Sequence, residues 1–266
     1  MTPDPAQRSA PTGSPPRSRP GSRLVSLLHW ISRTTSAHVT LLLILAVGLV
    51  PAVALTAVSA EVYESVAEAD GIAGLDRPVL EFALRLRSPG ADAAVTAFTN
   101  LAGSIGMPVI AGVAVLMMCL RWRSWTPLVL TAAAAAGSLL MTISGKALIG
   151  RTRPDLADAV PPYESSASFP SGHTLNSIVI AGVLAYLVIL HVHTRRAAAA
   201  AVLVAAAFSL AVGLSRVYLG HHWLTDVLVA WTLGAAWLAV VITGHQLLRR
   251  LTGRAAVPGS PPRRRR

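Results

Sequence analysis

The chain has 266 residues, of which 53% are hydrophobic and 13% charged, and its mean hydropathy is +0.56. Because soluble domains typically carry about a quarter charged residues, this composition excludes an ordinary soluble protein and places the chain in a membrane. The net charge of +11 comes from 22 Arg and a single Lys. A charge of that sign fits nucleic acid, an anionic membrane surface or an anionic substrate, and the positions of the charges must decide between them.

Both ends of the chain have the composition of tails. Residues 1–37 are rich in Pro, Ser, Gly and Arg and have no apolar period, which is typical of a disordered segment. Residues 249–266 end in four Arg and are expected to form a second, basic tail that can lie against anionic lipid headgroups. Nucleic-acid binding by this tail is the rival interpretation, and we expect none. The residues between the tails, 38–248, are expected to form one membrane domain.

Six apolar runs are long enough, or nearly so, to cross the ~30 Å hydrocarbon layer of a membrane as helices. Val58 and Ala60 would suit a signal-peptide cleavage site after the first run, but the preceding region is far longer than a secretory n-region, which favours a helix. The predicted fold is therefore all-α, a polytopic membrane protein with six transmembrane helices. The spans are expected near residues 38–60, 103–120, 126–147, 173–193, 197–214 and 223–245.

The distribution of charge predicts the orientation of these spans. Lys and Arg near span ends are retained on the cytoplasmic side. Placing the N-terminus inside leaves 16 of the 23 basic residues in the cytoplasm and 11 of the 12 acidic residues outside. Both termini are then cytoplasmic, and the connections 61–102, 148–172 and 215–222 are external.

The first external connection contains two weakly amphipathic stretches. One begins at Asp76, which could cap a helix that has Pro78 in its first turn. The other runs from Ala91 to Leu101. Both are expected to be short helices lying at the membrane interface, where they either pack over the bundle or assist lipid entry.

Three basic residues of the external side point to an anionic ligand. Arg153 and Arg216 offer forked donors that match phosphate oxygens, and Lys146 adds a compact point charge. Lys146 is the only lysine in the chain, although a lysine at the end of a span can also be a snorkelling interfacial anchor. Lys146 and Arg153 follow from the end of the third span and Arg216 from the end of the fifth, on one face of the membrane, so a shared phosphate-binding pocket at the membrane surface is expected.

The stretch Pro170–His173 predicts a tight turn leading into the fourth span. Gly172 permits close approach of the backbone, and the helix N-terminus behind it favours an anion. Ser171 can donate its hydroxyl to a phosphate or cap the helix, and we expect both roles. His173 lies in the first helical turn, where it is placed to protonate a departing oxygen.

His222 and Asp226 are four residues apart at the start of the last span, so their side chains can meet on one face of a helix. A carboxylate that accepts from one ring nitrogen leaves the other free to attack phosphorus. His221 is the competing nucleophile, but at the same spacing it faces Thr225. The alternative is a pair of interfacial histidines and an Asp that stabilises the helix dipole.

These residues resemble the type 2 phosphatidic acid phosphatase family, which is related to vanadium haloperoxidases. Its signature has three parts: Lys, six residues, Arg-Pro; then Pro-Ser-Gly-His; then Ser-Arg, five residues, His, three residues, Asp. All three match in order, at Lys146, Arg153, Pro154, Pro170–His173, Ser215, Arg216, His222 and Asp226. Arg151 lies outside these positions. We expect it to sit at the membrane interface, and the alternative is that it assists in binding a second phosphate.

The resemblance implies a metal-independent, cofactor-free phosphatase that works through a phosphohistidine. In that mechanism His222 attacks and His173 protonates the leaving group, while the phosphate oxygens are held by Lys146, Arg153, Ser171, Gly172 and Arg216. The alternatives are a vanadate-dependent haloperoxidase, a phosphotransferase and a non-catalytic lipid-phosphate binder.

The expected partners are a lipid phosphate substrate and membrane lipids, in a bacterial cell membrane with the active site facing outward. Undecaprenyl diphosphate is preferred by a small margin over phosphatidic acid and phosphatidylglycerophosphate. The oligomeric state is left open.

Overall fold

The computed structural model describes residues 37–255, and within that range the chain is helical with connecting turns and loops. The predicted all-α class is confirmed. The tails expected at 1–37 and 249–266 lie for the most part outside the described residues, although the last helix continues to Ala255. The elements are α2 (Ala37–Glu68), η1 (Gly71–Leu75), α3 (Asp76–Arg85), α4 (Pro89–Asn100), α5 (Gly106–Trp122), α6 (Thr126–Ile149), η2 (Leu156–Asp158), α7 (Gly172–Ile189), α8 (Arg195–Tyr218) and α9 (Leu224–Ala255).

Among the described residues, five helices are long and apolar enough to cross a membrane, namely α2, α6, α7, α8 and α9. The protein is therefore a multi-pass membrane protein. α5 is apolar but has only 17 residues, so the span expected at 103–120 stays a prediction. The first long helix continues to Glu68, beyond the end expected at residue 60, because its amphipathic continuation has no helix-breaking residue before Ala69.

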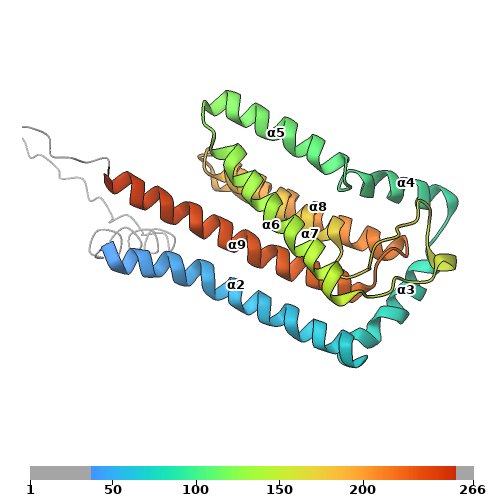
Figure 1. Ribbon diagram of the computed structural model, residues 1–266. Helices are drawn as coiled ribbons and strands as arrows, with labels where there is room; N and C mark the ends of the chain where they lie inside the picture. The colour runs from blue at the N-terminus through green and yellow to red at the C-terminus, as the bar shows by residue number, and fades with distance from the viewer. Residues whose placement is uncertain (1–36, 256–266) are drawn as a thin grey trace, which may run out of the picture. The chain divides into compact units, whose positions relative to one another are not determined.

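α7 lies at the centre of the bundle, with α6, α8 and α9 packed around it (Figure 1). The chain divides into two units, residues 1–43 and 44–266, and this bundle lies wholly in the second. Its core is a stripe of fully buried side chains at four-residue spacing on α7, which places them on one helix face. The stripe consists of Leu175, Val179, Val183 and Leu187.

Two glycines allow helices of the bundle to approach α9 closely. A Cβ atom on Gly137 of α6 would lie 2.2 Å from Cε2 of Trp237, and one on Gly213 of α8 would lie 2.4 Å from Cζ2 of Trp231. Each indole N–H also donates to a backbone carbonyl of the facing helix, at 3.0 Å in both cases. The two tryptophans of α9 are therefore seated in notches that any larger residue would fill.

The connection between α2 and α5 contains two short helices, α3 and α4, near the expected positions, and their location at the membrane interface stays a prediction. Ser88 caps α4, its hydroxyl accepting from the amide of Ala91 at 3.3 Å. The capping role expected of Asp76 is wrong: the cap position of α3 is Leu75, and the Asp76 carboxylate accepts from the amide of Thr225 instead, at 2.9 Å. The carboxylate is thus used for a long-range contact with the start of α9.

Candidate active site

The three groups of residues singled out in the sequence meet at one end of the helix bundle. They lie in the last turns of α6 and α8, the first turns of α7 and α9, and the connections before α7 and α9. Because α6 and α8 end where α7 and α9 begin, the helix ends and the connections between them bring distant parts of the sequence together. The site residues so gathered are Lys146, Arg153, Ser171, Gly172, His173, Arg216, His222 and Asp226.

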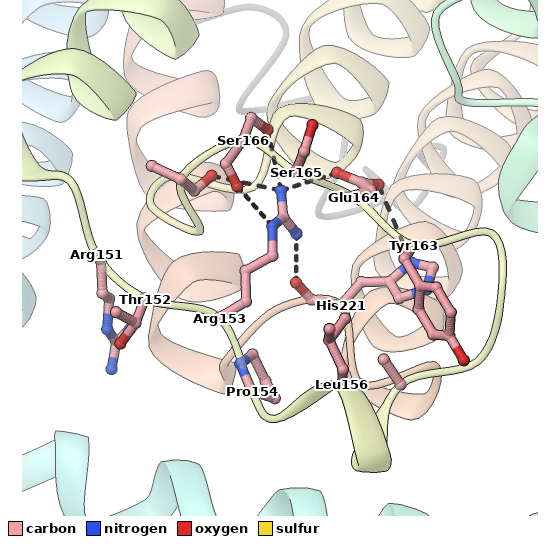
Figure 2. Close-up of a pocket in the computed structure, with 13 residues that line it drawn as sticks. Arg151, Thr152, Arg153, Pro154, Leu156, Tyr163, Glu164, Ser165, Ser166 and His221 are labelled. Atoms are coloured by element: carbon pink, nitrogen blue, oxygen red, sulfur yellow. Dashed lines mark hydrogen bonds and ion pairs between the residues drawn. The ribbon is translucent and has the colours of Figure 1, made fainter.

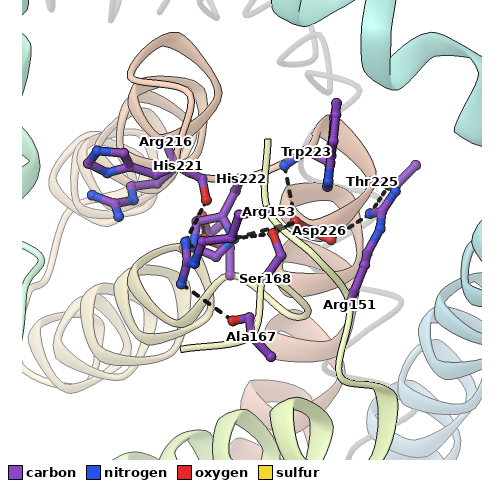
Figure 3. A network of polar contacts seen from close by, with 12 residues as sticks. Arg151, Arg153, Ala167, Ser168, Arg216, His221, His222, Trp223, Thr225 and Asp226 are labelled. Atoms are coloured by element: carbon purple, nitrogen blue, oxygen red, sulfur yellow. Dashed lines mark hydrogen bonds and ion pairs between the residues drawn. The ribbon is translucent and has the colours of Figure 1, made fainter. Parts of the chain in front are cut away.

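His222 and Asp226 form the expected pair, with Nδ1 of the imidazole 3.4 Å from Oδ2 of the carboxylate. They do not share a helix face, because α9 begins at Leu224 and His222 lies in the turn before it. That turn folds back over the helix start, where the amide of Trp223 donates to Asp226 at 3.0 Å. A hydroxyl that the sequence reasoning missed also donates to Asp226, that of Ser168, at 2.5 Å (Figure 3).

The other ring nitrogen of His222 faces the guanidinium of Arg153, with Nε2 3.3 Å from Nη1. A guanidinium can only donate, so Nε2 accepts and the ring proton lies on Nδ1, toward Asp226. Burial lowers the pKa of His222 to about 4, although Asp226 opposes the shift. The imidazole is therefore neutral near pH 7, and its lone pair points toward the basic residues.

Arg151 does not lie at the interface as preferred from the sequence. Its Nη1 donates to Asp226 at 2.6 Å and its Nη2 donates to Asp76 at 2.7 Å. The Thr225 hydroxyl joins this network, accepting from Arg151 at 2.8 Å and donating to Asp76 at 2.7 Å. The interface expectation fails because two buried carboxylates require a cation nearby, and Arg151 provides it.

Arg153 is bound on every side of its guanidinium (Figure 2). Nε donates to the carbonyl of Ser166 at 2.7 Å, Nη1 to the carbonyl of His221 at 2.5 Å, and Nη2 to the carboxylate of Glu164 at 2.8 Å. Lys146 approaches the same loop, its Nζ donating to the hydroxyl of Ser166 at 3.2 Å and to the carbonyl of Ala167. Lys146 is thus directed into the site and not outward like a snorkelling anchor.

Arg216 and His173 complete the basic group, and both face Glu164. Arg216 is 2% exposed, donates from Nη2 to the Glu164 carboxylate, and has no partner for its Nε among the described residues. Nδ1 of His173 lies 3.9 Å from the same carboxylate. His221, the competitor of His222, donates from Nε2 to the carbonyl of Val160 at 2.7 Å, which ties its ring to the loop.

Ser171 and Gly172 lie at the start of α7 as expected. Ser171 occupies the cap position, but its hydroxyl pairs with that of Thr174 at 2.9 Å and makes no capping bond to a backbone amide. Its own amide donates to the carbonyl of Asp226 at 3.3 Å, which joins the starts of α7 and α9. A direct contact between the Ser171 hydroxyl and a phosphate stays a prediction.

Two of the cavities that adjoin the basic group are lined by Glu164, His173 and Gly103. The larger, of about 550 Å³, extends along the end of α4 toward Arg216. The smaller, of about 390 Å³, extends along α5 and α6 past Lys146 and the apolar Leu139. The site is thus open both to a polar space and to the apolar surfaces of spanning helices.

Sequence reasoning missed Glu164 and Ser168 altogether, assigned Asp76 only the role of a helix cap, and did not find the role of Arg151. The sequence indicated Glu164 only weakly: it lies in the same connection as Arg153, where its carboxylate is available to pair with the arginine. The contacts of Asp76 and Ser168 were not indicated, since their partners are remote in sequence and only the packed fold brings them to Asp226.

The sequence and the fold are similar to those of known proteins. Residues 125–250 match the model of the PAP2 superfamily. The chain is 33% identical over 167 residues to phosphatidylglycerophosphatase B of Bacillus subtilis (strain 168), which covers 62% of this chain and 80% of that protein. It also resembles the crystal structure of a transmembrane PAP2 type phosphatidylglycerolphosphate phosphatase from Bacillus subtilis, with a TM-score of 0.69 and 27% identity, covering 75% of this chain and 98% of the other. The range matched by the family model includes every site residue named above except Asp76 and Gly103, and this chain belongs to the PAP2 superfamily.

Proposed function

We propose that the protein is a membrane lipid phosphatase that removes a terminal phosphate through a phosphohistidine on His222. The observation that carries this proposal is the neutral imidazole of His222, backed by Asp226 and facing Arg153 across 3.3 Å. A lone pair held beside fixed cationic donors is what attack on a phosphate ester requires, because phosphoryl transfer depends on positioning and on stabilising charge.

In the first step Nε2 of His222 attacks phosphorus, the P–N bond forms and the P–O bond to the leaving group breaks. Arg153, Arg216 and Lys146 stabilise the charge on the non-bridging oxygens, with the backbone at Gly172 and the Ser171 hydroxyl as further donors. Asp226 stabilises the positive charge that develops on the imidazole. Burial, together with Arg216, lowers the pKa of His173 to about 3, so the negative charge of the substrate phosphate must raise this pKa before the ring carries the proton. His173 then donates that proton to the departing oxygen, which leaves as an alcohol or, from a diphosphate, as a phosphate.

In the second step a water molecule attacks the phosphorus of the phosphohistidine. The deprotonated His173 accepts the proton of that water, the P–N bond breaks, and inorganic phosphate leaves with His222 again neutral. The residues present supply every proton and donor in this scheme, and it needs no metal ion or cofactor.

The position of the site favours a lipid substrate. The basic group lies at the ends of membrane helices, and one of its cavities continues along the apolar side chains of α5 and α6. The similarity to a protein named phosphatidylglycerophosphatase B supports phosphatidylglycerophosphate as the substrate, ahead of undecaprenyl diphosphate, which the sequence alone had preferred, and ahead of phosphatidic acid.

The proposed topology has six spans, with α5 as the short one, and both termini in the cytoplasm. The site then faces the outside, and α3 and α4 lie at the outer interface. The excess of Arg at the opposite ends of the spans supports this orientation. Single cysteines introduced at Arg77 and Arg123 in a Cys119→Ser background test it: a membrane-impermeant maleimide should label only the first in intact cells.

The test of the activity is an assay of purified protein in detergent with EDTA against the three lipids. Wild type and the His221→Asn variant should release phosphate, and the His222→Gln variant should release none while it remains folded. Acid-labile radiolabel on wild type but not on His222→Gln would identify the phosphohistidine, and retained turnover in His222→Gln would refute the assignment. Transfer to an alcohol, or vanadate-dependent halide oxidation without phosphate release, would instead support the transferase or haloperoxidase alternative.

A further inference from the structure

The carboxylate of Glu164 lies inside the group of basic residues to which the proposed function assigns the phosphate. Arg153 donates to Oε2 at 2.8 Å, and Arg216 donates to Oε1. The ring nitrogens of His173 and His221 lie 3.9 and 4.0 Å from Oε1. One anionic side chain of the protein thus contacts the same donors that a substrate phosphate would need.

The contact is electrostatic, and Glu164 remains charged at any physiological pH. Burial alone would raise the pKa of Glu164, but the charges of Arg216, His222 and Arg153 outweigh it and hold the pKa at about 2. The carboxylate therefore does not leave the basic group by taking up a proton. A competing anion is needed to displace it.

The carboxylate fits the basic group incompletely. It has two oxygens, and Nε of Arg216 is buried without a partner among the described residues. A tetrahedral phosphate presents three oxygens to its binding residues and can occupy donors that a planar carboxylate leaves free. The site is therefore built for an anion with more oxygens than Glu164 provides.

Glu164 is also positioned to move. It lies in the connection between η2 and α7, where the chain forms no regular helix, and its neighbours Tyr163, Ser165 and Ser166 are exposed. Its own side chain is 28% exposed, against 2% for Arg216. Rotation of this side chain away from the arginines would disturb no helix of the bundle.

We propose that Glu164 is a specificity-determining residue that competes with the substrate for the phosphate site, an inference that rests on the proposed function. A membrane surrounds the site with phosphodiester lipids, each of which carries one negative charge on its phosphate, as Glu164 does. Such a headgroup gains no charge interaction by displacing the carboxylate. A terminal phosphate carries close to two negative charges at neutral pH. It therefore interacts more strongly with the basic residues than the carboxylate that it displaces. The carboxylate thus excludes the abundant diesters and admits monoesters and diphosphates.

The test measures binding, so that it does not depend on turnover. Calorimetry in detergent compares inorganic phosphate with diethyl phosphate, a soluble monoanionic diester, on wild type, Glu164→Gln and the control Glu81→Gln. Glu81 is exposed and pairs only with Arg77 among the described residues. We expect Glu164→Gln to bind inorganic phosphate about ten-fold tighter or more, because a like charge has been removed from the site, and to bind diethyl phosphate measurably. Wild type and Glu81→Gln should bind phosphate equally and should not detectably bind the diester.

Unchanged or weaker binding of both anions by Glu164→Gln would overturn the proposal and assign Glu164 a structural role. A gain for inorganic phosphate alone would overturn the selection against diesters. If Glu164→Gln does not fold, hydrogen exchange of the wild type decides: saturating phosphate should speed exchange of amides 163–166, whereas slower or unchanged exchange would contradict displacement. If the expected binding pattern appears but no lipid phosphate is hydrolysed, the proposed function fails while the anion site stands.

Discussion

Arg151 donates a 2.6 Å hydrogen bond to Asp226, the carboxylate that orients His222. The same guanidinium donates to Asp76 at the start of α3. The orientation of the proposed nucleophile thus depends on a residue outside the family motif, and through it on a helix of the first connection.

Replacing Arg151 should therefore affect both stability and turnover. Arg151→Ala leaves Asp76 and Asp226 buried without their cation, which should cost about 3 kcal/mol of unfolding free energy. Arg151→Lys keeps the charge but cannot bridge both carboxylates, so kcat should fall about ten-fold with little change in KM. Thermal unfolding and steady-state kinetics in detergent measure the two effects.

The matched control is Arg77→Ala. Arg77 also pairs with two acids, Glu81 and Asp158, but it is more than half exposed, and surface pairs contribute little to stability. Its removal should leave the apparent Tm and kcat near those of wild type. Equal effects of Arg77→Ala and Arg151→Ala would contradict the role given to Arg151.

Ser168→Ala should lower kcat more than KM. The Ser168 hydroxyl donates to Oδ2 of Asp226 at 2.5 Å and lies 3.5 Å from Nδ1 of His222. Its loss removes one of the donors to this buried carboxylate oxygen and leaves the Trp223 amide as another, at a cost of about 1–3 kcal/mol. Kinetics of the variant check this, with Ser165→Ala as control because Ser165 is exposed. A fall in apparent Tm without any fall in kcat would show that the hydroxyl only supports the fold.

His173→Asn should separate substrates by leaving group. Without its proton donor, release of a lipid alkoxide should slow by about a hundred-fold or more, whereas p-nitrophenyl phosphate, whose leaving group needs no proton, should react at a rate much closer to wild type. The ratio of the two rates is the measurement. His191→Gln is the control, since His191 lies stacked on Trp122 beyond the end of α7. Equal losses on both substrates would remove His173 from the role of acid.

Stability should fall as the pH is lowered from about 6.5 to about 4. The pKa of His222 is depressed from 6.5 to about 4 by burial, so in this window the unfolded chain binds a proton that the folded protein does not. The stability that the folded protein owes to a neutral His222 is fully present above pH 6.5 and is lost as the pH falls toward 4. Apparent Tm against pH should therefore be less steep for His222→Gln than for wild type, and unchanged for His193→Gln, whose side chain is exposed.

Glu164 should add a second loss of stability in more acidic solution. Its pKa is held near 2, below the ordinary 4.5, because the charges of Arg216, His222 and Arg153 outweigh the effect of burial. Its contribution is present above pH 4.5 and disappears toward pH 2. Glu164→Gln should lack this lower step, and a step of wild-type size in that variant would contradict the ion pairs described for Glu164.

The sequence predicted the helical class and the convergence of the motif residues because both depend on local patterns. Apolar runs indicate spans, and residues such as Arg216 and His173 lie at the ends of such runs. The pairing of His222 with Asp226 was predicted from a shared helix face, yet it arises from the turn before α9. Spacing predicted the partners correctly, although the backbone between them follows a different path.

Contacts between remote segments could not be predicted in this way. Asp76 is separated from Thr225 by most of the membrane domain, and nothing near either residue indicates the other. The same holds for Ser168 and Asp226, which meet because the connection before α7 folds over the start of α9. Buried polar groups require partners, but which partner each finds depends on how the helices pack.

The notches at Gly137 and Gly213 have a consequence for the geometry of the site. Trp237 and Trp231 seat in them from α9, and a displacement of that helix by a single residue would shift it about 1.5 Å along its axis. Such a sliding motion would carry Asp226 out of line with Arg151 and Ser168. The two tryptophans therefore act as axial stops that hold Asp226 level with Arg151 and Ser168.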